Sequence, residues 1–134
     1  MATKWLGLAP VLVFAIASPL AAHPKAGDAV AKQVSTAAAH AGMALGAADL
    51  KMAHAHLQHV VNCLVGPSGE GYDAKQADPC KGMGQGALVD AKGDAARESQ
   101  LQAALAQAQH GVKATTLDQA HADAQKAMNS LQAH

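Results

Sequence analysis

Alanine, leucine and valine recur along this chain of 134 residues at intervals of three and four, and this spacing most limits how it can fold. Apolar residues at such intervals share one face of an α-helix. No segment alternates apolar and polar residues, or gathers β-branched and aromatic ones, as a strand would. The sequence therefore predicts an all-α protein.

Four segments carry such an apolar stripe. We expect helices over 28–45, from 49 to about 65, from between 87 and 94 to about 111, and from 115 or 116 onward. The stripes consist of Val30, Val34, Ala37, Ala41 and Leu45; Leu50, Ala53, Leu57, Val60, Val61 and Leu64; Leu101, Leu105, Ala108 and Val112; and Leu117, Ala120, Ala124, Met128 and Leu131.

Residues with capping preferences stand at the ends of these segments. Asp28, Asp49 and either Thr115 or Thr116 are candidate N-caps, because their side-chain oxygens can accept from free backbone N–H groups. Gly46 and the pair Gly66-Pro67 are expected to end the first two helices.

Short turns join the helices within each pair, whereas glycine, proline, aspartate and lysine fill 66–86 without any period. Short turns require antiparallel neighbours, so we expect an up-down-up-down four-helix bundle with a long loop between the second and third helices. In that arrangement both short turns lie at the same end of the bundle.

The first 22 residues have the layout of a secretory signal. Lys4 supplies a positive charge, an apolar run follows from Trp5 to Ala17, and small residues end the segment at Ala22. Such a run is too short to span a bilayer stably. We expect cleavage after Ala22, or alternatively after Ala17, and a periplasmic or secreted protein that is not held in a membrane. A retained N-terminal anchor is the alternative.

The remaining residues, 23–134, are expected to form one domain. Without Lys4 the charges are nine Lys and Arg against ten Asp and Glu. A nearly neutral domain without a basic face offers nothing to attract nucleic acid. A core built mostly of alanine buries little area per residue, so its stability is expected to depend on a disulfide, a metal or a partner.

Cys63 and Cys80 stand at the two sides of the long loop. Two cysteines in an exported chain favour a disulfide. The alternative is metal ligation, because His56, His59 and Cys63 follow one side of a helix and Cys80 could complete a set of four ligands. The two uses exclude each other, because a bonded sulfur is not a thiolate.

Eight histidines follow the expected signal: His23, His40, His54, His56, His59, His110, His121 and His134. Histidine is the commonest protein ligand for metals. The sequence assembles no pair of nucleophile and base and no carboxylate dyad, so we expect a metal-binding protein and not an enzyme.

Bundle topology brings several of these side chains to the end that carries the two short turns. By helical phase, His54 and His121 stand at the edge of the core and are the expected principal ligands. His40, His56, Met43 and Met52 are expected to assist, whereas His59 and His110 are expected to face outward.

Cleavage after Ala22 would begin the mature chain with His23. An N-terminal histidine can chelate copper through its amine and an imidazole nitrogen. In this one residue the chain resembles exported copper oxygenases and copper carriers whose mature chains begin with histidine. The resemblance implies His23 as a further copper ligand.

Imidazole and thioether ligands in an oxidising compartment favour copper, followed by zinc or nickel. We therefore expect an exported copper buffer or carrier. Its expected partners are the metal ion and either another exported metal-handling protein or a second copy of the chain. Because imidazole must be neutral to ligate, metal affinity should fall as the pH drops below about 6.

Two other functions remain open. The bundle plan is similar to that of the exported four-helix-bundle cytochromes, which implies a non-covalent haem electron carrier with Met43 or Met52 and His121 as axial ligands. The chain lacks a C-x-x-C-H motif for covalent haem. The last alternative is a structural or regulatory helical module whose histidines bind no metal.

Overall fold

The computed structural model describes residues 25–133, and over this range the chain is all-helical, as predicted. Its elements are α1 (Ala26–Leu45), α2 (Leu50–Val65), the one-turn helix α3 (Ala87–Asp90), α4 (Ala95–Val112) and α5 (Leu117–Gln132). No strand occurs within residues 25–133. The expected signal at 1–22 and the expected ligand His23 lie outside the described residues.

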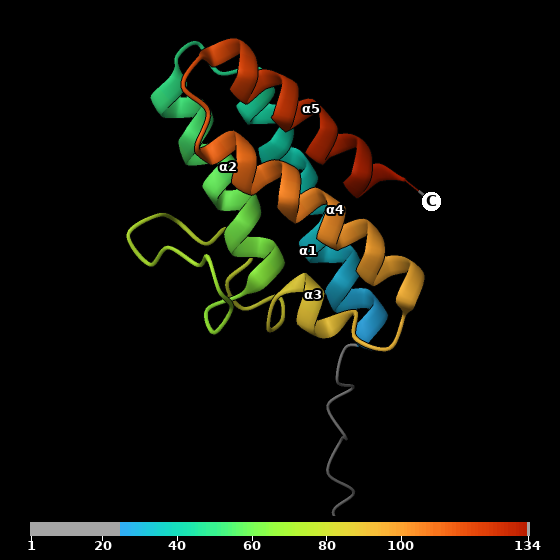
Figure 1. Cartoon of the computed structure of the whole chain (residues 1–134). Helices are drawn as coiled ribbons and strands as arrows, with labels where there is room; N and C mark the ends of the chain where they lie inside the picture. The colour runs from blue at the N-terminus through green and yellow to red at the C-terminus, as the bar shows by residue number, and fades with distance from the viewer. Residues whose placement is uncertain (1–24, 134) are drawn as a thin grey trace, which may run out of the picture.

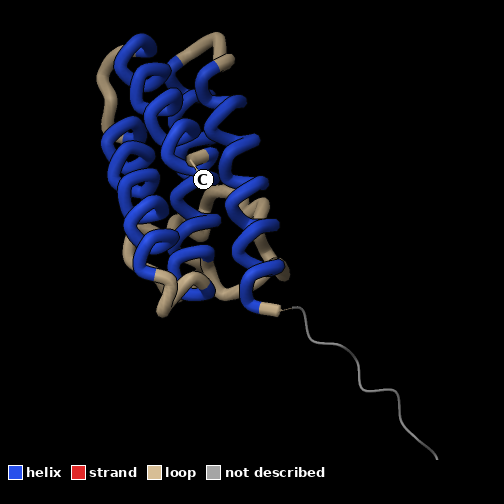
Figure 2. Tube along the Cα trace, turned by 90° about the vertical axis from the view of Figure 1, so that its right-hand side faces the viewer, coloured by secondary structure: helices blue, strands red, loops and turns tan. Residues whose placement is uncertain are grey.

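The long helices pack side by side in a bundle-like arrangement (Figures 1 and 2). Helix α1 contacts α2 and α5, and α4 contacts α5 and α2. The turns that join α1 to α2 and α4 to α5 gather at one end of the molecule, away from the loop 66–86 and from α3 (Figure 1).

The four predicted stripes make up most of the core. Every stripe residue is either buried or packed against the buried cluster. Small side chains allow the helices to approach closely, and Gly111 shows how closely: a Cβ at this position would lie 2.7 Å from Leu57 Cδ1. The core therefore has little room for a larger side chain at this crossing.

Most helix ends follow the predicted caps. Asp49 accepts from Met52 N at 2.8 Å, and Thr116 accepts from Gln119 N at 3.2 Å. Gly46 and Gly66 follow the last residues of α1 and α2.

Two helix starts differ from the prediction. Helix α1 begins at Ala26 after Lys25, so Asp28 is not the cap but lies in the first turn, where its charge complements the helix dipole. The expected third helix is divided into α3 and α4. The chain turns at Gly93, where φ is +98°, and Asp94 then caps α4 by accepting from Arg97 N at 3.0 Å.

The loop 66–86 is attached to the helices by a cysteine pair and by a buried amide. Cys63 and Cys80, the predicted pair, lie at disulfide distance with their Cα atoms 5.1 Å apart. The fully buried Asn62 side chain donates to the carbonyls of Asp73 and Ala77 and accepts from Asp73 N. These contacts hold the loop against the end of α2.

Candidate metal centre

Three histidine side chains converge along the contact between α1 and α2: His40 from α1, and His56 and His59 from α2. The Nδ1 atom of His40 lies 3.3 Å from Nδ1 of His56 and 3.3 Å from Nδ1 of His59. One ring nitrogen from each residue lies within 4.8 Å of the other two, and all three side chains are half-buried. We call these residues the three-histidine cluster.

The turn between α1 and α2 sets the register of this cluster. His40 precedes Gly46 by six residues and His56 follows Asp49 by seven, so the two stand at about the same height on neighbouring helices. His59 lies three residues beyond His56, which places it on nearly the same side of α2. The cap formed by Asp49 fixes where α2 starts and thereby the height of both histidines.

The nitrogen separations suit a single bound ion. A tetrahedral metal with imidazole nitrogens at ~2.0–2.1 Å holds its ligand atoms about 3.3 Å apart. The two Nδ1 separations measured from His40 have this value. Three such ligands leave the fourth corner of the tetrahedron for a further donor.

Hydrogen bonds alone cannot give every facing ring nitrogen of the cluster a well-directed partner. Each Nδ1 either carries one proton or offers one lone pair. His40 Nδ1 faces two other Nδ1 atoms, so it can form one well-directed N–H···N bond but not two. A cation bound to all three lone pairs, with the protons on the Nε2 atoms, would satisfy every facing nitrogen.

The surroundings favour the neutral form of His40 and His59. Burial lowers the pKa of His40 below its ordinary value of 6.5, and repulsion from His59 and His56 lowers it further. The pKa of His59 is lowered in the same way, first by burial and then by His56. A lowered pKa favours the unprotonated imidazole, which is the form that ligates metals.

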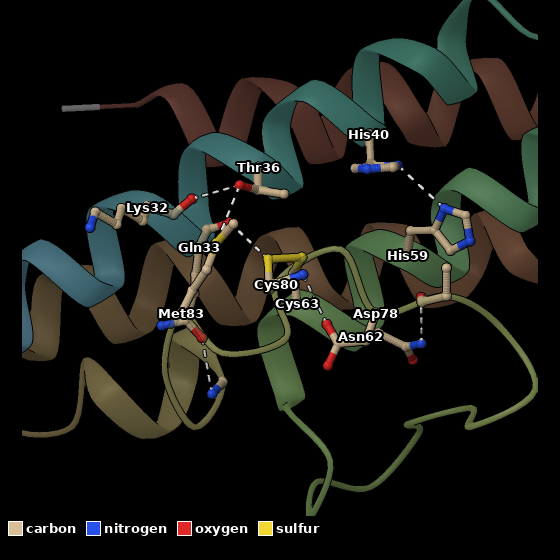
Figure 3. Close-up of a disulfide and its surroundings, with 12 residues drawn as sticks. Lys32, Gln33, Thr36, His40, His59, Asn62, Cys63, Asp78, Cys80 and Met83 are labelled. Carbon is tan, nitrogen blue, oxygen red and sulfur yellow. Dashed lines mark hydrogen bonds between the residues drawn. A yellow bond between two sulfur atoms is a disulfide. The ribbon is translucent and has the colours of Figure 1, made fainter.

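The cysteine pair lies beside the cluster, one helical turn beyond His59 (Figure 3). Thr36 stands one turn before His40 on α1 and donates to Met83 Sδ at 3.6 Å. Cys63, Asp78 and Cys80 also lie close enough together to hold an ion. With the two sulfurs bonded to each other, that group lacks thiolate ligands.

The expected principal ligands, His54 and His121, each bind a backbone carbonyl. His54 Nε2 donates to Ala114 O at 2.9 Å, and His121 Nε2 donates to Ala47 O at 3.0 Å. Each residue thus connects its own helix to the turn of the other helix pair. Because these nitrogens carry the donated proton, they are not free to ligate while the bonds persist.

The remaining expected residues are distributed differently. His110 is largely exposed, as expected, but its Nδ1 donates to Oδ2 of the buried Asp123 at 2.6 Å. Met43 and Met52 are exposed on α1 and α2. Among the expected ligands within residues 25–133, His40 and His56 are therefore the pair whose ring nitrogens meet.

The sequence prediction placed His59 only in the alternative ligand set with His56 and the two cysteines, and otherwise expected it to face outward. Helical phase places His59 away from the core, and in the structure its side chain is indeed half-buried and not part of the core. It faces His40 on the neighbouring helix instead. Counting residues outward from the turn 46–49 would have indicated this pairing.

Comparison with known proteins adds no relative: no family model, curated protein or solved structure matches the chain. Within residues 25–133, no helix has the length and apolar character needed to cross a membrane.

Proposed function

We propose that this chain is an exported protein that binds a transition-metal ion, copper in the first place, at His40, His56 and His59, and that it serves as a buffer or carrier. The observation that carries the proposal is the convergence of three imidazoles, with Nδ1 of His40 at the separation of tetrahedral ligands from Nδ1 of both His56 and His59. This ligand set replaces the expected pair of His54 and His121.

The chemistry of the cluster suits a carrier. Half-buried ligands on neighbouring helices can be reached from solvent, and three protein ligands leave one position at which a donor molecule or an acceptor can bind the ion. Imidazole nitrogen suits copper and zinc. Zinc is therefore the alternative metal, and the partners proposed with it are another exported metal-handling protein or a second copy of the chain.

The proposal includes the up-down-up-down bundle plan, because that plan explains the register of the cluster. Support comes from the contacts of α1 with α2 and of α4 with α5. The two hydrogen bonds from His54 and His121, each to the turn of the other pair, also support it.

Export is proposed from the layout of residues 1–22, and a cysteine pair at disulfide distance fits an oxidising compartment. Intact mass of protein recovered from the exported fraction tests this step. A chain that begins at His23 is expected, whereas a chain that still carries Trp5 would contradict cleavage.

Metal titration tests the binding site. The purified protein should bind one copper or zinc ion in competition with a chromophoric chelator. Replacing all three histidines of the cluster by glutamine should abolish that binding, because glutamine fills a similar space without a strong ligand nitrogen.

The matched control is the double variant His54→Gln and His121→Gln, which removes two histidines but leaves the cluster intact. It should bind the ion as the unmodified protein does. If this control loses binding and the cluster variant retains it, the ligands are His54 and His121, as expected from the sequence. Absence of binding in the unmodified protein would refute the function.

A further inference from the structure

Two methionines are exposed on the two helices that carry the three-histidine cluster. Met43 is 49% exposed and Met52 is 47% exposed, and among residues 25–133 the other large apolar side chain with such exposure is Val89. This exposure leaves both methionine side chains accessible to a dissolved ion. Met83 and Met128, in contrast, pack against the core.

Both exposed methionines are helical neighbours of cluster ligands. Met43 follows His40 by three residues, and Met52 precedes His56 by four, and residues at these spacings share a face of the helix. Long helical side chains lean toward the helix N-terminus. Met43 therefore leans toward His40, and His56 leans toward Met52.

The two methionines also lie on the side of the cluster nearest the turn between α1 and α2. At a rise of ~1.5 Å per residue, each Cα stands about 4–6 Å along its helix from that of its histidine neighbour. The cysteine pair occupies the other side of the cluster (Figure 3). In height along the helices, the two methionines therefore lie between the turn and the three histidines.

We infer that Met43 and Met52 form an outer thioether site that receives copper(I) and passes it to the three-histidine cluster. The inference rests on the proposed metal-binding function and extends it by naming the oxidation state of the ion and its route. No electron is transferred in this step, because one monovalent ion exchanges thioether ligands for imidazole ligands.

Ligand softness separates copper(I) from the alternative metal. Thioether sulfur is a soft, uncharged donor that binds copper(I) and contributes little to zinc. The two methionines should therefore affect binding of a soft monovalent ion and leave zinc binding unchanged. Silver(I) is the suitable probe, since it has the same charge and preferences as copper(I) but is not oxidised in air.

The test follows the methionine methyl groups of the full chain by NMR while silver(I), and separately zinc, is added. Silver(I) should shift the methyl signals of Met43 and Met52 more than those of the internal controls Met83 and Met128, and zinc should shift none of the four strongly. The double variant Met43→Leu and Met52→Leu should bind silver(I) about tenfold more weakly and zinc equally well. The single variant Met128→Leu is the matched control.

The outcomes distinguish this inference from the function on which it rests. If zinc binds at the histidines but silver(I) leaves the methyl signals of Met43 and Met52 unmoved, the outer site is refuted and the metal-binding function stands. If neither ion binds in a way that depends on the three histidines, both are refuted. Equal loss of zinc and silver(I) in the methionine double variant would also overturn the outer site, because it would indicate general damage to the fold.

Discussion

Histidine serves three different purposes among the described residues. His54 and His121 donate to backbone carbonyls, His110 donates to a buried carboxylate, and the three-histidine cluster turns ring nitrogens toward one another. Carbonyls and carboxylates satisfy a ring N–H group fully. In the three-histidine cluster, ring nitrogens face one another in place of such acceptors.

Lowered pKa values in the cluster make stability depend on pH. The unfolded chain takes up protons at its histidines as the pH falls below about 6.5. Folded His40 and His59 resist protonation because burial and neighbouring imidazoles lower their pKa. The free energy of unfolding of the metal-free protein should therefore fall as the pH drops below about 6.5, and this loss should level off below the lowered pKa values.

Urea unfolding at a series of pH values between neutral and mildly acid measures this effect. The double variant His40→Gln and His59→Gln removes both groups, so its stability should change less over the same range. A variant whose profile matches that of the unmodified protein would show that these histidines titrate normally.

The pair formed by His110 and Asp123 gives a prediction about stability alone. Asp123 is buried, and its other charged neighbour, Lys126 Nζ, lies 3.9 Å away. Replacing His110 by alanine should lower the free energy of unfolding by about 1–3 kcal/mol, because it removes the donor to a buried acceptor. Metal affinity should not change.

Chemical denaturation of His110→Ala measures this cost. Adding Asp123→Asn in the same chain should recover part of the stability, because a neutral amide is less costly to bury than a carboxylate without its donor. An unchanged midpoint in the single variant would show that solvent or Lys126 satisfies Asp123 unaided.

Helical phase predicted which residues are apolar core but not which polar residues are buried. Gln33 and Asn62 are both buried, and both bind backbone groups of the loop. A single sequence carries no periodic signal for these contacts, since the loop has no period. Helical phase also gave His54 and His121, on α2 and α5, as principal ligands, whereas the histidines that converge lie on α1 and α2.

At the scale of elements, periodicity and capping residues were sufficient to predict the long helices. The predicted caps Asp49 and Thr116 are confirmed, because their side-chain oxygens accept from backbone N–H groups in the first turn of each helix. The division into α3 and α4 was not predicted, because the positive φ of Gly93 interrupts a segment of continuous helical composition.

The loop 66–86 gives a prediction at this scale. Replacing Cys63 and Cys80 together by serine should lower the free energy of unfolding by about 3 kcal/mol, because the unfolded chain would lose a closed loop. Asn62 should still hold part of the loop. Metal affinity should remain, because α1 and α2 position the three histidines.

Denaturation, together with hydrogen exchange of the loop amides, measures both effects. Exchange should accelerate within 66–86 and stay slow in α1 and α2. Loss of metal binding in the serine variant would contradict the account, because it would make the cysteine pair part of the metal site.

At the scale of the whole molecule, the proposed metal site bears on the stability of the alanine-rich core. A core of small side chains gives modest stability, and a ligand that binds the folded state alone adds to that stability. The three-histidine cluster joins α1 to α2 across their contact, so a bound ion would stabilise this helix pair directly. Metal loading should therefore raise the unfolding temperature.

The central claim is that His40, His56 and His59 bind one transition-metal ion together. Its most direct test is anomalous diffraction from crystals of the protein loaded with copper or zinc. The account predicts one principal peak at ~2.0–2.1 Å from a ring nitrogen of each of these three residues. A principal peak at His54 and His121, or no ordered ion near the three-histidine cluster, would contradict it.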